Sequence, residues 1–203
     1  VSRAVRRSMV HAGTNPEQIA VVYNGIEPIA IPTAEEKAAL LQSYGGQPGE
    51  KAVGMVARLE EVKDHETFLL AAQNVLENRK DVRFYIVGDG SLREELERRA
   101  YELGISQWVT FTGFVKDVEK IEAALDIAVI TSKAEALCLS IIESNMAGVP
   151  AIGTDSGGVR EVIRHGETGF LVSVGDSDRL AERMEELLAD DKKRKAFGEH
   201  EKK

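Results

Sequence analysis

Two basic side chains five positions apart are the first residues in this sequence that could bind an anionic substrate. Arg58 and Lys63 stand on either side of Glu60 and Glu61. Arginine offers a planar fork of donors and lysine a mobile point charge, so together they can hold both phosphates of a diphosphate. The two glutamates also allow a plainer interpretation, in which the segment is a solvated loop whose charges cancel. Spacing alone leaves both interpretations open.

Two carboxylates eight positions apart, Glu135 and Glu143, form a second group. If a helix begins between them, its free amides near residues 138–140 carry the positive end of the helix dipole and suit a phosphate. Hydroxyl-binding carboxylates on either side would then fit a sugar, a diphosphate and a ribose in line. Glu143 has a competing explanation, because Ser140 three positions earlier completes a capping-box pattern with it. A lone loop glutamate such as Glu135 is also usually just solvated.

The remaining polar motifs are weaker. In Ser156-Gly157-Gly158 the paired glycines either let the backbone approach a ligand closely or form a tight turn. Asp176-Ser-Asp178 precedes a helical pattern and is interpreted as a helix cap. The four histidines have no metal-ligand spacing to one another or to Cys138, so no metal site is expected. Cys138 itself is interpreted as a small residue in a tight turn and not as a nucleophile.

Composition excludes several classes of protein. The 203 residues include 26 basic and 34 acidic side chains, a net charge of −8. Nucleic-acid binding needs a basic face, so no nucleic-acid partner is expected, although a small anion held by two or three cations is compatible. A single cysteine rules out an internal disulfide and favours a reducing compartment, so we expect a cytoplasmic protein. No apolar run approaches the roughly 20 residues of a bilayer span, and no signal peptide is recognisable.

Short apolar runs alternate with longer amphipathic segments, and continuous apolar runs are typical of strands buried on both faces of a parallel sheet. The expected strands are Ile19–Tyr23, Ala52–Ala57, Val82–Val87, Val109–Thr112, Ile127–Ile130, Val149–Gly153 and Phe170–Val172. The expected helices are Ala34–Tyr44, His65–Asn78 (capped by Asp64), Leu92–Leu103, Val118–Ala124, Ser140–Ala147, Val159–Arg164 and Asp178–Leu188. The alternation predicts an α/β fold with a Rossmann-like parallel sheet and helices on both faces.

Three regions are expected along the chain. Residues 1–18 read as the end of a preceding domain, with the end of a helix and a turn at residues 14–16, and the first residue, Val1, suggests a fragment. Residues 19–190 form the sheet domain. Residues 191–203 form a charged, solvated helix or tail. In such sheets ligands bind outside the carboxyl ends of the strands, where Arg58 and Glu135 fall.

Seven segments, in order, resemble the retaining glycosyltransferases of GT-B architecture, specifically the group 1 (family 4) set. They are Val21–Glu27, Val56–Lys63, Val87–Leu92, Val109–Val115, Glu135–Glu143, Gly157–Ile163 and His165–Leu171. Each segment alone is a weak signal, whereas seven in the family's order are a strong one. The similarity covers nearly the whole chain and concerns the second, donor-binding domain of these two-domain enzymes, so the fold it implies is the C-terminal half of GT-B.

The resemblance implies roles for particular residues. Arg58 and Lys63 would bind the donor diphosphate and stabilise the leaving group, and Glu135 would contact the donor sugar. Glu143 would bind the ribose hydroxyls. Backbone groups would complete the site, those of Gly113, Phe114 and Val115 facing the base and those of Leu137, Cys138, Leu139 and Ser140 facing the sugar and phosphates.

The implied function is donor binding in a retaining glycosyltransferase that moves a hexosyl group from a UDP-, GDP- or ADP-linked sugar to an acceptor hydroxyl, without metal or other cofactor. The acceptor would be bound by an N-terminal domain absent from this chain, and any contact with a membrane surface would come only through that domain. The isolated chain is therefore expected to be inactive.

Two other functions stay open at this point: a non-catalytic module that binds a nucleotide sugar, and a sugar-nucleotide epimerase of the same architecture. A mere binder has no need of a sugar-facing Glu135, and the glutamate pair argues against the epimerase. Ala136 and Cys138 stand where the family often has glycine, which leaves the identity of the donor sugar open.

Overall fold

Six parallel strands form a single sheet in the computed structural model, which describes residues 2–199. Their order across the sheet is β3-β2-β1-β4-β5-β6. The strands are β1 (Lys51–Val56), β2 (Val82–Val87), β3 (Val109–Gly113), β4 (Ile127–Ile130), β5 (Ala151–Thr154) and β6 (Gly169–Val172). The chain winds outward from β1 in one direction and from β4 in the other, so a crevice forms at the carboxyl edge between these two strands.

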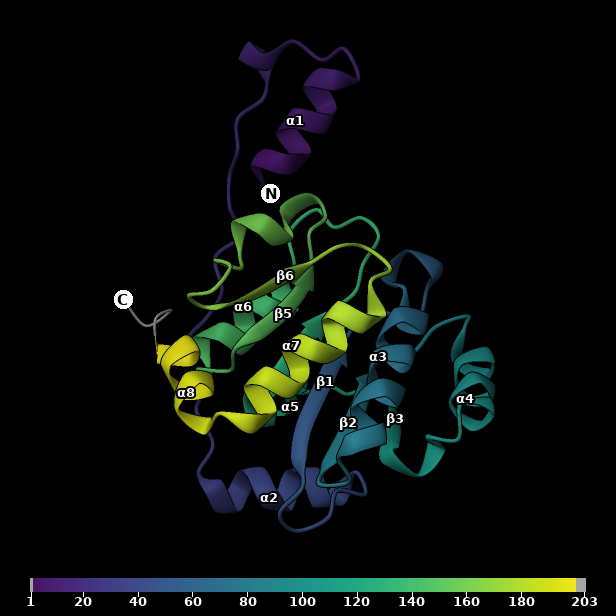
Figure 1. Cartoon of the computed structure of the whole chain (residues 1–203). Helices are drawn as coiled ribbons and strands as arrows, with labels where there is room; N and C mark the ends of the chain where they lie inside the picture. Colours follow the sequence, from purple (N-terminus) through teal and green to yellow (C-terminus); the bar gives the residue numbers. More distant parts are fainter. Residues whose placement is uncertain (1, 200–203) are drawn as a thin grey trace.

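Helices cover both faces of the sheet (Figure 1). On one face, α3 (His65–Asn78) packs against α4 (Arg93–Glu102) and α7 (Ser177–Ala189). On the other, α5 (Val118–Ala124) packs against α2 (Ala34–Ser43) and α6 (Leu139–Met146). Short 3₁₀ turns lie at Pro16–Gln18, Glu61–Lys63, Ser106–Trp108 and Gly157–Glu161. The expected Rossmann-like fold class is confirmed.

The central strands are apolar on both sides because both sides are covered. Phe84, Tyr85 and Ile86 follow one another in β2 and so point to alternate faces of the sheet. None of them is more than 2% exposed, and Phe84 meets Phe68 of α3 edge to face at 5.8 Å. Burying each such side chain stabilises the fold by about 1.5–3 kcal/mol. This continuous burial explains why the strands lack the alternation of polar and apolar residues seen in half-exposed sheets.

Two local predictions were wrong. Ile19–Tyr23 is not a strand: it belongs to an extended segment that is none of the six strands of the sheet, and its Val22 is 72% exposed. The Val159–Arg164 helix is the shorter 3₁₀ turn named above. Asp64 does occupy the N-cap position of α3, but its carboxylate accepts a hydrogen bond from the Thr67 hydroxyl at 2.7 Å and caps no backbone amide.

The C-terminal helix α8 (Asp191–Glu199) is also not the solvated helix that its charge predicted. Arg194 and Phe197 are both buried. Phe197 packs against Phe170 of β6 at a ring distance of 5.3 Å, and the Arg194 guanidinium donates to the Leu187 carbonyl at 2.9 Å. Arg194, Phe197 and Gly198, whose backbone lies close to that of Gly148, thus dock a helix whose composition is otherwise mostly polar. Residues 200–203 of the predicted tail lie outside the described residues.

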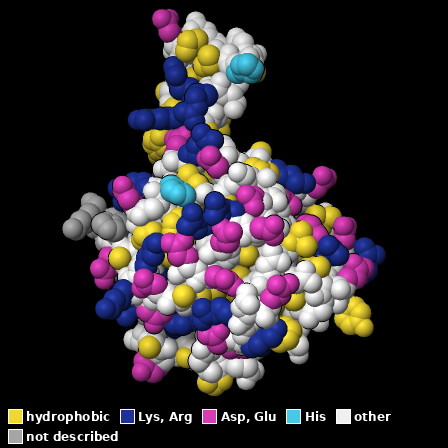
Figure 2. All heavy atoms as spheres, in the orientation of Figure 1, with side chains coloured by type: hydrophobic (Ala, Val, Ile, Leu, Met, Phe, Trp, Pro, Cys, Tyr) yellow, Lys and Arg dark blue, Asp and Glu magenta, His cyan; other side chains and the backbone are white. Residues whose placement is uncertain are grey.

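The first helix, α1 (Arg3–His11), stands away from the sheet at one end of the molecule (Figure 1). It touches the sheet domain through Glu161, whose carboxylate accepts hydrogen bonds from the amides of Arg3 and Ala4 and from the Tyr23 hydroxyl. A carboxylate at a helix N-terminus also matches the helix dipole. Below α1, on the face of the sheet domain seen in Figure 2, acidic and basic side chains are interspersed.

The paired glycines form both a turn and a close approach, but the approach is to the chain's own backbone. A Cβ on Gly157 would lie 1.9 Å from the Glu135 carbonyl oxygen, and one on Gly158 would lie 2.1 Å from that of Ala136. The Gly158 amide donates to the Glu135 carbonyl at 2.8 Å. Gly157 also has a φ of +51°, which favours glycine. The glycines therefore position the loop that carries Glu135.

Replacing Gly158 with alanine is expected to cost about 1–3 kcal/mol of the free energy of unfolding, because the new methyl group would overlap the backbone at Ala136. Urea denaturation measures the loss. Gly25→Ala is the matched control, since a Cβ there meets nothing within 4 Å, and it should stay within about 0.5 kcal/mol. Equal stability of the two variants would contradict the packing described above.

Candidate functional site

A hollow of about 400 Å³ lies where the sheet reverses its winding, and we call it the switch-point hollow. It is lined by the last residues of β1 and β4 and by residues that follow them: Val56, Ala57, Arg58, Lys63, Ile130, Glu135, Leu137, Cys138, Leu139 and Ser140. The carboxyl ends of two neighbouring strands thus bring together side chains more than 70 positions apart in sequence. Seven of the predicted site residues meet here.

An ion pair between Lys63 and Glu135 lies at the centre of this hollow. The Lys63 Nζ is 2.6 Å from Glu135 Oε2, and the two side chains are only 17% and 11% exposed. The Ser132 hydroxyl donates to the same carboxylate oxygen at 3.0 Å. The Glu135 carboxylate is therefore held in one place by a cation and a hydroxyl. The solvated-glutamate interpretation is wrong for this residue.

The backbone after β4 is held by hydroxyl groups. Thr131 donates toward the carbonyls of Lys63 and Asp64, at 2.9 and 2.8 Å, and so joins the β4 loop to the β1 loop. Thr154 and Ser156 both donate to the Ser132 carbonyl, at 2.6 and 2.8 Å. The loop is thus fixed on both sides, which favours a preformed site.

Arg58 is arranged differently from Lys63. Its guanidinium is 75% exposed and lies 2.8 Å from the Glu60 carboxylate, while Glu61 points to Lys133 at 3.6 Å. The charge-cancelling interpretation therefore describes Arg58 and does not describe Lys63. An exposed pair of this kind contributes little to stability, so Arg58 can exchange Glu60 for another anion at small cost.

The N-terminal end of helix α6 lies at the switch-point hollow. It begins at Leu139, with Cys138 at the N-cap position, and the Cys138 side chain makes no capping hydrogen bond. The capping-box explanation of Glu143 is therefore wrong, because Ser140 is already inside the helix. Burial raises the pKa of the Cys138 thiol to about 11, so it is a neutral, buried group, as expected of a residue that is not a nucleophile.

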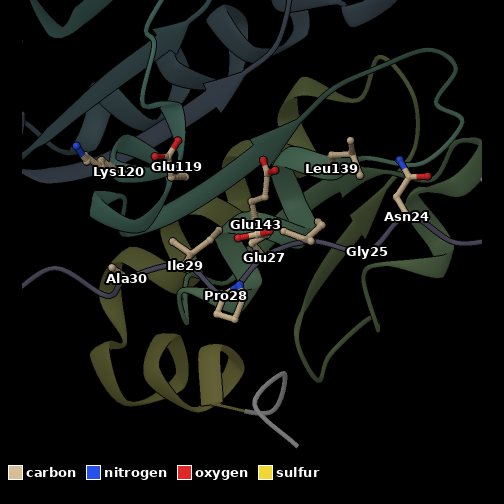
Figure 3. A pocket seen from close by; sticks show the side chains of 11 residues that line it. Asn24, Gly25, Glu27, Pro28, Ile29, Ala30, Glu119, Lys120, Leu139 and Glu143 are labelled. Atoms are coloured by element: carbon tan, nitrogen blue, oxygen red, sulfur yellow. The ribbon is translucent and has the colours of Figure 1, made fainter.

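Glu143 lines a second hollow of about 540 Å³, which we call the linker pocket. One wall is the extended segment from Asn24 to Ala30, and the other comes from Glu119 and Lys120 of α5 with Leu139 and Glu143 of α6. Figure 3 shows the segment running past Glu143. Leu139 lines both hollows, so the linker pocket and the switch-point hollow adjoin.

The linker wall was not expected from the sequence. Asn24 and Glu27 were recognised only as part of a family segment, and no spacing indicated that the segment would lie against α6. The remaining predicted residues, Gly113, Phe114 and Val115, line neither of the two hollows. Gly113 ends β3 with a φ of +71°, and Phe114 is 82% exposed.

A third hollow, of about 610 Å³, lies between the start of α3 and α4. One of its lining residues is His65, which is 1% exposed and whose ring nitrogens find no partner among the described residues. Burial lowers the pKa of His65 to about 4, so it is neutral at physiological pH. Asp176 accepts from the Arg179 amide at 3.0 Å, which confirms it as the cap of α7.

Residues 2–199 contain no cluster of three or more His, Cys, Asp or Glu side chains that could hold a metal ion. None of their helices has the length and apolar character of a membrane-spanning segment.

Comparison with known families decides what kind of protein carries this site. The family model described as "Glycosyl transferases group 1" matches residues 36–203. The chain belongs to this family. The group 1 glycosyltransferase family inferred from the seven segments is therefore confirmed.

Named relatives agree with the assignment. The chain is 32% identical over 196 residues to the uncharacterized glycosyltransferase MJ1607 of Methanocaldococcus jannaschii, covering 94% of this chain and 50% of the relative. It is 30% identical over 203 residues to N-acetyl-alpha-D-glucosaminyl L-malate synthase of Bacillus anthracis, covering 98% of this chain and 53% of that enzyme.

A solved structure shows the same architecture. The crystal structure of Anabaena Alr3699/HepE in complex with UDP and glucose superimposes with a TM-score of 0.90 at 27% identity, over 98% of this chain and 55% of that one. The chain therefore spans about half the length of the relatives and of the structure it matches.

Cys138 is expected to resist thiol reagents in the folded chain. With a pKa of about 11, only about one thiol in 1,000 is ionised at pH 8, and the residue is buried as well. Labelling with a chromogenic disulfide should become complete only after denaturant is added. The control carries Cys138→Ser and Ala134→Cys, which places a thiol at an exposed position of the same loop and should label within minutes. Equal rates in the two native proteins would show that Cys138 is accessible.

Proposed function

We propose that this chain is the donor-binding half of a retaining glycosyltransferase, which transfers a hexosyl group from a nucleoside-diphosphate sugar to an acceptor hydroxyl. The observation that carries the proposal is the switch-point hollow, where Arg58, Lys63, Glu135 and the start of α6 meet at the carboxyl edge of the sheet. Two cations and a helix N-terminus suit a diphosphate, and a carboxylate suits sugar hydroxyls.

Both cations are already paired with carboxylates, and this bears on how a donor would bind. A diphosphate entering the hollow would replace Glu60 at Arg58 and Glu135 at Lys63. Glu135, released from Lys63 but still bonded to Ser132, would then be free to accept a hydrogen bond from a sugar hydroxyl. Donor binding would thus convert an internal ion pair into two contacts with substrate.

The chemistry proposed for this arrangement is front-face transfer. The acceptor hydroxyl attacks the anomeric carbon on the side from which the diphosphate departs. The carbon–oxygen bond to phosphate breaks, the new glycosidic bond forms, and the acceptor proton passes to the departing phosphate oxygen. Arg58, Lys63 and the α6 amides would stabilise the charge that grows on that oxygen, which is an electrostatic role and needs no nucleophile from the protein.

The rest of the donor would extend along α6. Glu143 in the adjoining linker pocket is placed to accept hydrogen bonds from the ribose hydroxyls. We assign the base to the backbone at Gly113, Phe114 and Val115, beyond β3. UDP is the first nucleotide to test because the matched Anabaena structure contains UDP and glucose.

The proposed acceptor-binding partner is a second domain in the part of the relatives that this chain does not span. The single free cysteine favours a reducing compartment, so we place the protein in the cytoplasm.

Loss of the two cations is expected to weaken nucleotide binding by about 100-fold. In the double variant Arg58→Gln and Lys63→Gln, an amide at position 63 keeps a donor on the side of Glu135 while the charge is lost, and the melting temperature of the variant checks that the fold is retained. Two charge-assisted contacts contribute about 1.5–3 kcal/mol each, and about 3 kcal/mol corresponds to roughly 100-fold. Titration calorimetry with UDP, GDP and ADP measures the change.

The matched control for this experiment is Arg98→Gln with Lys133→Gln. It removes the same charge from the third hollow, and both side chains are at least 47% exposed. Its nucleotide affinity should stay within about twofold of the original. Unchanged affinity in the Arg58/Lys63 variant, or equal loss in both variants, would place the diphosphate elsewhere.

The 203-residue chain alone is expected to bind donor and to transfer sugar only at background rate. Without an acceptor domain nothing positions the attacking hydroxyl, and positioning is worth about 7–11 kcal/mol in a two-substrate reaction. A labelled nucleotide sugar and a panel of acceptors test this, with a full-length group 1 enzyme as positive control. Transfer at a rate comparable to the control would mean that the acceptor site lies within this chain.

A further inference from the structure

Glu122 of α5 is a carboxyl group with no exposed surface. Its two oxygens find no hydrogen-bond donor among the described residues. An ionised carboxylate in such a place lacks both water and a partner, and this costs far more than holding a proton. Burial, reinforced by the negative charge of Glu143, raises the pKa of Glu122 to about 9. At neutral pH Glu122 is therefore an uncharged carboxylic acid.

The charged groups around Glu122 explain why it finds no cation. From α6 it faces Glu143, and from its own helix Glu119, both acidic. Lys37 of α2, which packs on α5, is bonded instead to Asp126 Oδ1 at 3.1 Å and the Leu125 carbonyl at 3.2 Å. Lys51 of β1 is paired with Asp191. Lys120, the neighbouring cation on α5, is bonded to Asp117 at 2.7 Å, and no described residue forms an ion pair with the Glu122 carboxyl or donates a hydrogen bond to it.

The neighbour that matters is Glu143, which lies on α6, the helix that packs against α5, and which raises the pKa of Glu122 through its charge and as a side-chain hydrogen-bond partner. Two ionised carboxylates offer only acceptors and repel each other. With one proton between them, the buried acid supplies the donor and the pair carries one negative charge. Glu143 lines the linker pocket whereas Glu122 has no exposed surface, so Glu122 is the member of the pair that holds the proton.

We propose that Glu122 is a positioning residue for the nucleotide site: as a carboxylic acid it donates a hydrogen bond to a Glu143 carboxylate oxygen and orients that side chain toward the linker pocket. The inference rests on the proposed function, in which Glu143 accepts hydrogen bonds from ribose hydroxyls. It assigns a role to a residue that touches no substrate. It also accounts for the position of Glu143 in a pocket that Glu27, Glu119 and the cation Lys120 line as well.

Two substitutions separate donation from simple filling of space. Glu122→Gln keeps the shape and an N–H donor and removes the titrating proton, whereas Glu122→Met fills similar volume with no donor. At pH 7 the Gln variant should bind UDP within about twofold of the original chain. The Met variant should bind at least tenfold more weakly, the loss expected for a hydrogen bond to a charged group. Met binding as tightly as the original would overturn the positioning role.

The pH profile provides a readout that space filling would not move. Above about pH 9 Glu122 ionises in the original chain, and repulsion from Glu143 should then weaken UDP binding. The ratio of the two affinities, original to Gln variant, cancels the titration of UDP itself and should fall between pH 8 and 10. If the Met variant fails to fold, this ratio carries the test, and a ratio independent of pH would overturn the proposal.

Melting temperatures test the proton without any nucleotide. Unfolded Glu122 titrates near 4.5 and folded Glu122 near 9, so the original chain must take up a proton on folding throughout that window and loses stability as pH rises through it. The Gln variant has no such loss, and its advantage in melting temperature should grow from pH 5 to pH 8.5. Parallel curves would show that Glu122 is ionised in the fold and would overturn the proposal. If the original chain binds none of UDP, GDP or ADP, the proposed function fails, whereas the melting curves still decide whether Glu122 holds the proton.

Discussion

The ion pair between Lys63 and Glu135 joins the two loops that the reversal of the sheet places side by side. At 2.6 Å, with both side chains more than four-fifths buried, neither charge can lose its partner cheaply. Removing one member of a buried pair costs about 3–5 kcal/mol, because the other is left uncompensated. The Thr131 hydroxyl joins the same two loops by donating to the Lys63 carbonyl, and the Ser132 hydroxyl donates to the Glu135 carboxylate. A diphosphate that replaced Glu135 at Lys63 would bring its own negative charge, so the Lys63 ammonium group would still have an anionic partner.

Backbone packing at glycine makes this arrangement achievable. The Gly88-Asp89-Gly90 segment, like the Gly157-Gly158 pair, faces the chain's own backbone: a Cβ on Gly88 would lie 2.2 Å from the Ala57 carbonyl, and one on Gly90 would lie 2.5 Å from that of Leu59. Glycines after β2 therefore hold the β1 loop with Arg58, and glycines after β5 hold the β4 loop with Glu135. Two family segments that look like ligand-binding signatures in the sequence act here by letting neighbouring loops approach within hydrogen-bonding distance.

Burial decides which titratable groups near the site carry charge. His65, Cys138 and Glu122 are all buried, and in each case desolvation moves the pKa so that the uncharged form prevails at neutral pH, to about 4, 11 and 9 respectively. None of these three groups therefore adds a charge beside the site. This leaves the cations beside the proposed diphosphate and the carboxylates beside the proposed hydroxyls as the electrostatic features that a donor would meet.

The sequence by itself determined the sheet, most of the helices and the family. Three elements have the predicted bounds: the strands Val82–Val87 and Ile127–Ile130 and the helix His65–Asn78. Their bounds could be predicted because apolar periodicity and helix ends are local properties of a few adjacent residues. Placement of Arg58, Lys63 and Glu135 at one sheet edge also followed, since loops after parallel strands share that edge.

Only the tertiary structure decided what distant segments do to one another. An apolar run such as Ile19–Tyr23 has the same sequence pattern whether it becomes a strand of the sheet or an extended segment outside it. The spacing of Ser140 and Glu143 likewise does not show that the helix already begins at Leu139. The pairing of Lys63 with Glu135 spans 72 positions. The neutral state of Glu122 depends on helices α5 and α6 packing together, because burial and long-range charge are properties of the folded chain and no short stretch of sequence contains them.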